Sequence, residues 1–443
     1  MNDYLKQFER KRLMILGFGR EGVSTYHFIR KHFPDKVLLI ADKNKQEKLD
    51  IELQEILKKD NNLQFFGGES YLGALNKADL VIKTPGIPNK LKEIKQSRVN
   101  GVEFTSQTKI FLHLCPSIIV GITGTKGKST TSSLTNHILK NIGLKSELMG
   151  NIGCPPLDYL SEDKDKIYVF EMSSHQLSDL DKSPHIAVFL NIFLEHLDYY
   201  ENYDDYLSAK ANITKYQMKD DFFIYDGDFT VIRKIAENSP AKIINFKETT
   251  LPKLNTKLIG IHNIKNIKAA VSVAKIFKLN DDQITDAVKS FTPLDDRLEL
   301  IANLNGVDYV DDGLATIPQA TIAAIEAFGS KIITLVLGGY DRGLEYDSLI
   351  NKIIKSRNLV NVILTGQIAD KLEKSLYKNG YNGKVLNLNN SPMIIVVKKC
   401  AEISKPGSIV LLSPAATSFD MYKDYKDRAE QFKKAVLNLK ILR

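Results

Sequence analysis

The sequence predicts an α/β fold of three successive domains, each built on a doubly wound, mainly parallel sheet. Short, wholly apolar segments alternate with helix-like stretches along nearly the whole chain, which is typical of strands buried on both faces by helices. Chemically distinctive residues directly follow several of these segments. A chain of 443 residues is long enough for about three domains of ordinary size. By pattern alone we place them at residues 1–106, 107–294 and 295–443.

The first block carries a nucleotide-binding pattern. After an apolar strand at 13–16, residues 17–22 read Gly-Phe-Gly-Arg-Glu-Gly and open a helical stretch, and a second strand at 37–40 is followed by Asp42. This is the fingerprint in which glycines form a tight turn and the acidic residue takes ribose hydroxyls. A third strand at 80–82 ends in the turn 84–88, where α/β sheets place ligands. From these residues alone, a purely structural turn stays open as the alternative.

The second block opens with a phosphate loop. Residues 121–130 read Gly-Ile-Thr-Gly-Thr-Lys-Gly-Lys-Ser-Thr, between an apolar strand at 118–122 and a helical pattern. Glycines let backbone N–H groups surround an anion, and the helix N-terminus adds about half a positive charge. Lys128 can reach terminal phosphates and the Ser129 hydroxyl can bind Mg²⁺. Ile122 stands where the general pattern has glycine, so we interpret the stretch as a loop variant that binds ATP. A Gly/Thr-rich turn between two core elements is the structural alternative.

Two further strands of this block end in polar residues. The apolar segment 167–170 is followed by Glu171, a candidate Mg²⁺ ligand beside Ser129, although a surface-capping glutamate is the structural alternative. The segment 186–190 leads to His196. From spacing alone, His196 is interpreted as a hydrogen-bonded loop residue and Lys210 as part of a solvated helix face.

The third block repeats the alternation of strands and helices. We expect strands at 332–337, 359–364 and 409–412, and helices at 317–328, 347–355 and 422–437. This order predicts another doubly wound domain.

Composition excludes several classes of protein. No apolar run approaches the ~20 residues of a membrane span, and the charged N-terminus does not resemble a signal peptide. Cys115, Cys154 and Cys400 have no paired spacing, so we expect neither a disulfide framework nor a zinc site, and a reducing cytoplasm fits. The net charge of +8 comes from scattered lysines, so no nucleic-acid partner is expected.

Eight motifs occur in one order between residues 121 and 418, within a resemblance that runs from residue 13 to residue 432. They are Gly-x-Thr-Gly-Thr-x-Gly-Lys-Ser, Gly150-Asn151-x-Gly153, Glu171-Met-Ser-Ser-His-Gln-Leu, Glu195-His196-Leu-Asp198, Ala209-Lys210, Gly260-x-His262-Asn263-x-x-Asn266, Arg297-Leu-Glu and Leu412-Ser-Pro-Ala-Ala-Thr-Ser418. In this order and spacing the chain resembles the Mur ligases. The resemblance implies three α/β domains and ATP-dependent amide synthesis, in which a carboxylate becomes an acyl phosphate that an amine attacks. The similarity is greatest to members that join glutamate to UDP-N-acetylmuramoyl-L-alanine, with D-glutamate favoured and L-glutamate as the rival.

The resemblance also implies roles for individual residues. The catalytic set would be Lys128, Asn151, His196 and Lys210. ATP would be bound by Gly124, Thr125, Lys126, Gly127, Lys128, Ser129, Thr130, Asn263, Asn266, Arg297 and Asp312. Two Mg²⁺ ions would be served by Ser129 with Glu171 and by His196 with Lys210, the latter carbamylated by CO₂. The UDP substrate would contact Gly17, Gly19, Arg20, Glu21, Gly22, Asp42, Thr84 and Gly86, and the amino acid Thr316, Arg342, Ser418, Phe419 and Tyr425.

Two departures from the family pattern concern the amino acid. The stretch Asp-Ser-Lys-Ala-Thr-Asn of the family appears as Asp-Gly-Leu-Ala-Thr-Ile at 312–317, and Thr-Glu-Asp-His appears as Phe-Leu-Glu-His at 193–196. These changes spare the ATP machinery and leave the identity of the amino acid open. Rival functions are another Mur ligase, a folylpolyglutamate synthase, an NAD-dependent oxidoreductase and a non-catalytic nucleotide-binding regulator. A monomer is the working expectation.

Overall fold

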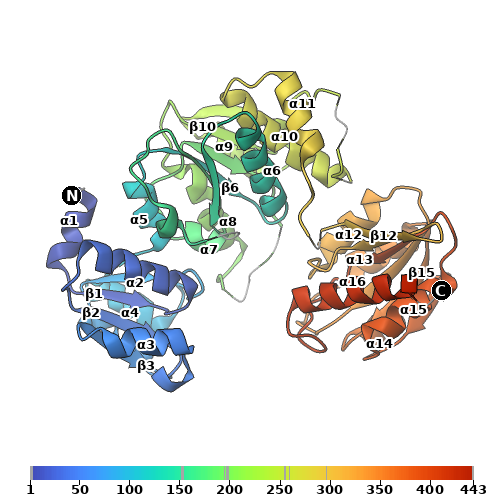
Figure 1. Cartoon of the computed structure of the whole chain (residues 1–443), viewed down its shortest axis with the longest axis horizontal. Coiled ribbons are helices and arrows are strands. Elements are labelled where there is room, and N and C mark those ends of the chain that lie inside the picture. The colour runs from blue at the N-terminus through green and yellow to red at the C-terminus, as the bar shows by residue number, and fades with distance from the viewer. Residues whose placement is uncertain are drawn as a thin grey trace. The chain divides into compact units, whose positions relative to one another are not determined.

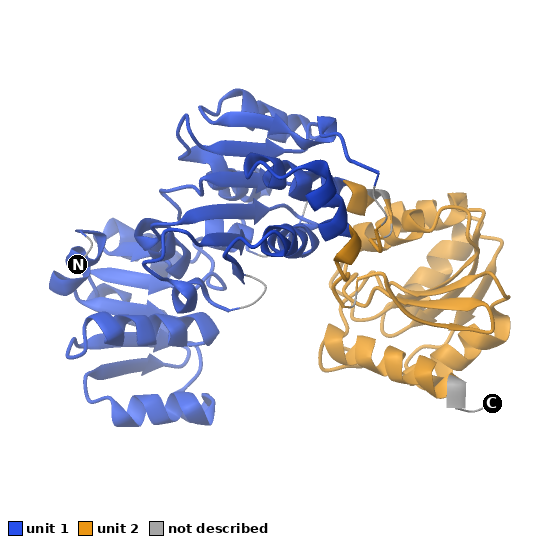
Figure 2. Cartoon of the chain, turned by 45° about the horizontal axis from the view of Figure 1, so that its top comes forward, with its two compact units in different colours: residues 1–254, 265–288 blue, residues 255–264, 289–443 orange. Residues whose placement is uncertain are grey.

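Three α/β sheets follow one another along the chain (Figure 1). The computed structural model describes residues 3–150, 154–193, 195, 199–253, 256–258, 260–295 and 297–441. Close packing divides the chain into two compact units (Figure 2). The first comprises residues 1–254 and 265–288, and the second comprises residues 255–264 and 289–443. The first two sheets belong to the first unit and the third sheet to the second.

The first sheet is parallel throughout, with strand order β3-β2-β1-β4-β5. Its strands are β1 (Leu13–Leu16), β2 (Leu38–Asp42), β3 (Leu63–Gly67), β4 (Leu80–Lys83) and β5 (Glu103–Thr105). Its helices are α1 (Asp3–Arg10), α2 (Arg20–His32), α3 (Ile51–Lys59), α4 (Lys92–Val99) and α5 (Gln107–Leu114). The strand order reverses between β1 and β4. Ligands of open α/β sheets usually bind at the carboxyl ends of two such strands, and we call this position the crevice.

The second sheet is also parallel, with order β11-β10-β9-β6-β8-β7. Its strands are β6 (Ile118–Thr123), β7 (Ser146–Gly150), β8 (Ile167–Glu171), β9 (Ile186–Phe189), β10 (Phe222–Tyr225) and β11 (Lys242–Asn245). The helices of this block are α6 (Lys128–Asn141), α7 (Ser174–Leu177), α8 (Tyr203–Lys215), α9 (Thr230–Glu237), α10 (Ile261–Ile276) and α11 (Asp281–Ser290). Strands β8 and β9 are buried along their length and flank β6, so the loops that follow the three strands lie side by side on a rigid support.

The third sheet is mixed, with order β12-β13-β17-β14-β15-β16. Its strands are β12 (Glu299–Leu304), β13 (Val307–Asp311), β14 (Ile333–Gly338), β15 (Leu359–Thr365), β16 (Lys384–Asn387) and β17 (Ile409–Leu412). Its helices are α12 (Pro318–Ala327), α13 (Asp347–Lys355), α14 (Ala369–Lys378), α15 (Met393–Ile403) and α16 (Tyr425–Ile441). Only β12 is antiparallel to its neighbour, with the other pairs parallel.

The predicted fold class is confirmed, and the expected strands lie within one or two residues of β1, β2, β4, β6, β8, β9, β14, β15 and β17. The strands that the apolar pattern did not identify lie mostly towards the sheet edges or are short. Strand β11, for example, begins with two exposed residues, Lys242 and Ile243, and such a strand lacks a continuous apolar run. No helix in the described ranges is long and apolar enough to cross a membrane. The predicted boundaries near residues 106 and 294 stay predictions.

Candidate functional site

The phosphate loop joins β6 to α6. Gly127 precedes the helix with φ +83°, a conformation that favours glycine, and a Cβ there would meet Asn266 Oδ1 at 2.3 Å. The Lys128 ammonium lies over the loop and donates to the carbonyls of Gly124 at 2.9 Å and Thr125 at 3.0 Å. Helix α6 has no acidic residue in its first turn, so its N-terminal N–H groups keep their attraction for an anion.

Residues outside the motif hold the loop in place. The Asn191 side chain accepts from Lys126 N at 2.8 Å and donates to Lys126 O at 2.9 Å, forming a two-point amide contact. The Thr125 hydroxyl lies 2.9 Å from the Tyr206 hydroxyl. Sequence reasoning gave no role to Tyr206, which lies four residues before Lys210 on α8 and therefore on the same helix face. The four-residue spacing to Lys210 was the sequence signal that could have identified Tyr206.

Glu171 and Ser129 suit a hard cation. Glu171 ends β8, is 1% exposed, and stands in register with Ile122 of β6, which leads into the phosphate loop. Ser129 lies in the first turn of α6 and is also buried. Within the described ranges no group of three or more His, Cys, Asp or Glu could hold a metal by itself. One carboxylate and one hydroxyl are nevertheless the protein share that Mg²⁺ takes when phosphates and water complete its shell.

Lys210 reaches the same loop from α8. Its side chain is 2% exposed, and its amine donates to Gly124 O at 3.0 Å, the carbonyl that Lys128 also uses. Burial lowers the pKa of Lys210 well below its ordinary value, and the charge of Lys128 lowers it further. Glu195 and Glu171 act on the same amine in the opposite direction. The predicted solvated helix face is therefore wrong for Lys210, which lies among the loop residues.

Two predicted catalytic residues, Asn151 and His196, lie outside the described residues. Glu195, next to His196, is described and pairs with Lys126 at 3.1 Å. The remaining predicted ATP residues of the second sheet, Thr130 and Asn266, are both buried. Asn266 lies against Gly127, so the structure joins the predicted adenine residue to the phosphate loop.

In the first sheet, the fingerprint glycines have distinct steric roles. A Cβ on Gly22 would lie 2.1 Å from Gly17 O, and a Cβ on Gly17 would lie 2.2 Å from Thr84 Oγ1. These close approaches bring the end of β1, the start of α2 and the residue after β4 together at the crevice. Gly19 and Gly86 have open space at the Cβ position, so no crowding requires glycine there.

The acidic residues of this crevice are already bonded. The Asp42 carboxylate accepts from Phe18 N at 2.7 Å and Asn44 N at 2.8 Å, so it holds the glycine turn. Glu21 accepts from Gln176 Nε2 of α7 at 3.3 Å, and burial raises the pKa of Glu21. Arg20 is exposed at the start of α2.

In the second unit, Asp312 follows β13 and accepts from Ser413 Oγ at 2.8 Å. Burial raises the pKa of Asp312 to about 7, against the opposing effects of Ser413 and Arg297. Arg297 is thus an electrostatic neighbour of Asp312, and the role of both residues in binding ATP stays a prediction. Asn263 is buried near the start of α10.

The predicted amino-acid residues differ in exposure. Ser418 is buried, Thr316 and Tyr425 are half-buried, and Arg342 and Phe419 are exposed. Ser418 and Phe419 follow β17, Tyr425 starts α16, and Arg342 follows β14. Strands β17 and β14 are paired in parallel, so their carboxyl ends share one sheet edge.

A polar cluster lies at this edge. The buried atoms Thr417 Oγ1, Ser418 Oγ, Asp420 Oδ1 and Arg428 Nε have no hydrogen-bond partner among the described residues. The guanidinium of Arg428 also donates to Gly313 O at 3.1 Å and Ala416 O at 3.0 Å. Arg428 was not predicted. It lies three residues after Tyr425 in α16, and the only sequence signal was an arginine at a helix position that faces the interior.

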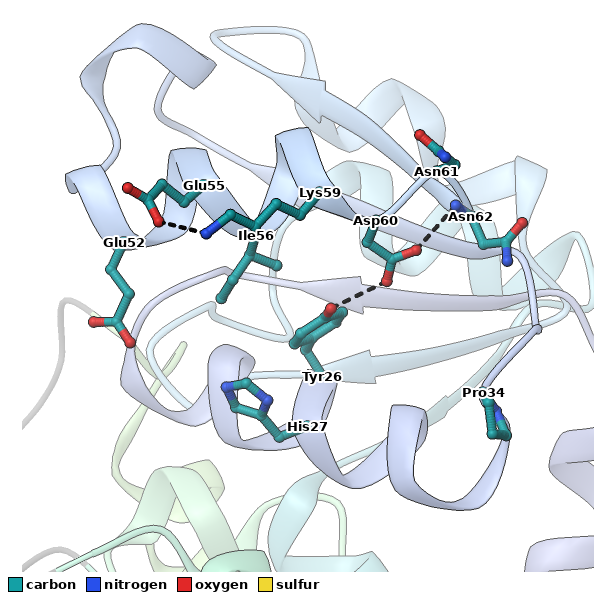
Figure 3. Close-up of a pocket in the computed structure, with 10 residues that line it drawn as sticks. All are labelled: Tyr26, His27, Pro34, Glu52, Glu55, Ile56, Lys59, Asp60, Asn61 and Asn62. Carbon is teal, nitrogen blue, oxygen red and sulfur yellow. Dashed lines mark hydrogen bonds and ion pairs between the residues drawn. The ribbon is translucent and has the colours of Figure 1, made fainter.

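An open pocket of about 480 Å³ lies elsewhere, beside α2 and α3 (Figure 3). Its polar groups bond mainly to one another: Asp60 accepts from the Tyr26 hydroxyl at 3.0 Å and from Asn62 N at 2.9 Å, and Lys59 pairs with Glu55 at 2.8 Å. Since Asn62 precedes β3, the pocket lies at the amino end of that strand, opposite the crevice. Its contacts tie α2 to the turn before β3.

A phosphate loop on a buried parallel sheet, with one further α/β sheet before it and one after it in the chain, is typical of nucleotide-binding P-loop proteins. The model of the Mur ligase middle domain matches residues 122–251. The chain is 32% identical to UDP-N-acetylmuramoylalanine--D-glutamate ligase of Acetivibrio thermocellus over 98% of each chain. It is also 32% identical to the ligase of that name from Clostridioides difficile, over 97% of this chain and 99% of that one. The chain therefore belongs to the Mur ligase family.

Solved structures agree at the level of the fold. The MurF ligase of Thermotoga maritima in complex with ADP matches with a TM-score of 0.60 at 17% identity, over 97% of this chain and 96% of that one. The MurC ligase of the same organism matches with a TM-score of 0.57 at 17% identity, over 97% and 100%. Both likenesses extend over all three sheets.

Proposed function

We propose that this protein uses ATP to join glutamate, with the D-isomer favoured, to UDP-N-acetylmuramoyl-L-alanine in peptidoglycan precursor synthesis. The observation that carries the proposal is the full-length identity to relatives named for this reaction. The phosphate loop supports it, because Lys128 and Lys210 converge on one carbonyl. The same ligase chemistry with L-glutamate or another amino acid is the second candidate, since the stretch 312–317 departs from the family pattern.

The residues suit the activation of a carboxylate. A carboxylate is a poor electrophile, so one of its oxygens first takes the γ-phosphoryl group of ATP, and ADP leaves. The amine of the amino acid then attacks the carbonyl carbon of the acyl phosphate, and phosphate leaves as the new amide nitrogen loses a proton. The enzyme must hold two anions together and screen their charge. Lys128 would exchange its loop carbonyls for terminal phosphates. Ser129 and Glu171 would hold Mg²⁺, which neutralises phosphate charge when bound.

We further propose that Lys210 carries a carbamate. Its amine is buried beside Lys128, and its lowered pKa favours the neutral form that can attack CO₂. The amine nitrogen attacks the carbon of CO₂, the electron pair of one C=O bond moves to oxygen, and one N–H proton passes to water, so the product presents an anionic oxygen ligand. With His196 it would serve the second Mg²⁺, where an ammonium would be repelled. Asn151 would lie near the γ-phosphate and the muramoyl substrate.

The other predicted contacts stay part of the proposal. The crevice of the first sheet would bind UDP, with Thr84 close to the glycine turn. Asn263, Asn266, Arg297 and Asp312 would hold adenine, ribose and phosphates. The unpartnered polar atoms at the edge of the third sheet support an amino-acid site there, with Arg342 as a partner for a carboxylate. We also propose that the protein acts as a monomer in the cytoplasm.

Phosphate release tests the reaction directly. The purified protein is given ATP, Mg²⁺ and UDP-N-acetylmuramoyl-L-alanine, with D-glutamate, L-glutamate or neither. We expect release only when both substrates are present, and faster release with D-glutamate. Release that needs no amino acid would contradict the ligase, and a preference for L-glutamate would favour the second candidate. Hydride transfer to NAD without phosphate release would indicate an oxidoreductase, and ATP binding without turnover would indicate a regulator.

A further inference from the structure

The loop that follows β4 is anchored by the block of the second sheet. This segment, residues 84–90, starts at the crevice, where Thr84 N and Thr84 Oγ1 both donate to Leu16 O. Past Thr84 the segment is neither helix nor strand up to α4. Its next anchors come from residues that follow α7 and β9, within the same compact unit.

The first anchor is a buried ion pair. Lys83 is 2% exposed, lies 3.6 Å from Asp179 and donates to Ile87 O at 3.0 Å. Asp179 also accepts from Asn89 Nδ2 at 3.0 and 3.1 Å and from Arg98 Nη2 at 3.0 Å. Burial raises the pKa of Asp179, but Lys83 and Arg98 outweigh it and hold that pKa below its ordinary value. The carboxylate is therefore charged, and it gathers both ends of the 84–90 loop.

The second anchor is a phenol. The Tyr199 hydroxyl lies 2.9 Å from Pro85 O and 3.0 Å from Ile87 O, on either side of Gly86. The Tyr199 ring packs against His175, with the ring centres 3.9 Å apart. Burial raises the pKa of Tyr199, so its hydroxyl keeps its proton and remains a donor. The single hydroxyl of Tyr199 therefore holds the peptide groups on both sides of Gly86.

We propose that Asp179 and Tyr199 are positioning residues that set the 84–90 loop for the uridine diphosphate part of the substrate. The inference rests on the proposed function for the identity of that ligand. Neither residue needs to touch the ligand. Each holds backbone next to Thr84 or Gly86, so its loss lets the loop move away from the crevice while the phosphate loop keeps its own contacts.

Binding of UDP by calorimetry tests this inference without turnover. Asp179→Asn keeps the shape and loses the charge, and we expect UDP affinity to fall about tenfold. Tyr199→Phe keeps the ring and loses the hydroxyl, and we expect a fall of about threefold. ATP affinity should stay unchanged in both. In turnover, the KM for the UDP substrate should rise by similar factors with little change in the KM for ATP.

Two matched controls separate positioning from general stability. Glu201→Gln breaks an exposed pair with Lys95 that also joins the two blocks, and Tyr203→Phe removes a nearby half-buried hydroxyl. Both should leave UDP affinity unchanged.

Unchanged UDP affinity in Tyr199→Phe and Asp179→Asn, or an equal loss of UDP and ATP affinity, would overturn the inference. If Asp179→Asn does not fold, Tyr199→Phe decides alone. A wild-type protein that binds UDP but releases no phosphate would contradict only the ligase, whereas one that does not bind UDP would contradict the inference.

Discussion

The carboxyl edges of the second and third sheets are prepared for ligands in opposite ways. At the second sheet, Lys128 and Lys210 donate to loop carbonyls, and the amide of Asn191 is bonded on both sides. At the third sheet, buried atoms of Ser418 and Arg428 have no partner among the described residues. The edge of the second sheet is held by internal hydrogen bonds, whereas the edge of the third sheet keeps polar atoms that can still bond to a ligand.

This difference has a consequence for the free energy of ligand binding. A buried polar atom without a partner costs about 1–3 kcal/mol, and a ligand that supplies the partner recovers that cost on binding. Internal bonds at the phosphate loop instead fix the shape of the loop before ATP arrives, so little reorganisation remains. We therefore expect changes at the second sheet to act mainly on turnover and changes at the third sheet mainly on amino-acid affinity.

Lys128→Ala is the most severe test at the edge of the second sheet, where internal bonds fix the phosphate loop. The terminal phosphates lose their point charge, so turnover should fall by on the order of 10³. Phosphate release with both substrates measures it. Lys140→Ala, which removes an exposed lysine from the same helix, is the matched control and should be close to wild type. Near-normal turnover of Lys128→Ala would remove the basis for assigning this loop to ATP.

Lys210→Ala should reduce turnover by about 10². Short carboxylic acids such as acetate should restore part of the activity, because the proposed missing group is an anionic oxygen. Lys215→Ala, at the exposed end of α8, should need no rescue. Full activity of Lys210→Ala without any added acid would argue against a carbamate.

The contrast also explains what could be predicted from the sequence. Strand β8 and Glu171 were foreseeable, because an apolar run buried on both faces leads directly to a polar residue at a sheet edge. The phosphate loop was foreseeable because Gly127 and Lys128 have a local pattern with a physical meaning. Both signals depend on neighbours in the chain.

The contacts that the sequence did not reveal are distant in the chain. Tyr206 meets Thr125 across 81 positions, and Arg428 meets Gly313 across 115. No local period encodes such pairs. Lys210 was misjudged for the same reason, since its own helix contains polar residues and only the packing of α8 beneath the phosphate loop buries its amine. Resemblance to a family, rather than spacing, indicated a role for Lys210.

At the third sheet, Ser418→Ala should raise the KM for D-glutamate about tenfold, because the ligand loses one hydrogen bond. The KM for ATP should hardly change. Ser391→Ala, in the turn before α15, is a control of the same chemistry. Steady-state kinetics with each substrate varied in turn separates the two constants. If the KM for ATP rises as much as that for glutamate, the two edges are not functionally distinct.

The smallest effect concerns Asp312. Its carboxyl is hydrogen-bonded within the protein, as at the second sheet, yet it is poorly solvated, as are the polar atoms at the third. Its pKa is about 7 in the folded protein against an ordinary value of 3.8, so between these values the folded state binds more protons than the unfolded state. Its contribution to stability is therefore complete below pH ~4 and is lost as the pH rises through about 7. Thermal unfolding of ligand-free protein at pH 5 and pH 8 should show a fall in Tm that is smaller, by a few degrees at most, in Asp312→Asn. Asp308→Asn is the control: Asn303 and Lys331 hold the pKa of Asp308 below its ordinary value, so its contribution to stability is the same at pH 5 and pH 8, and its removal should leave the difference in Tm between these two pH values unchanged. An identical fall in wild type and Asp312→Asn would show that this carboxyl ionises normally in the folded protein.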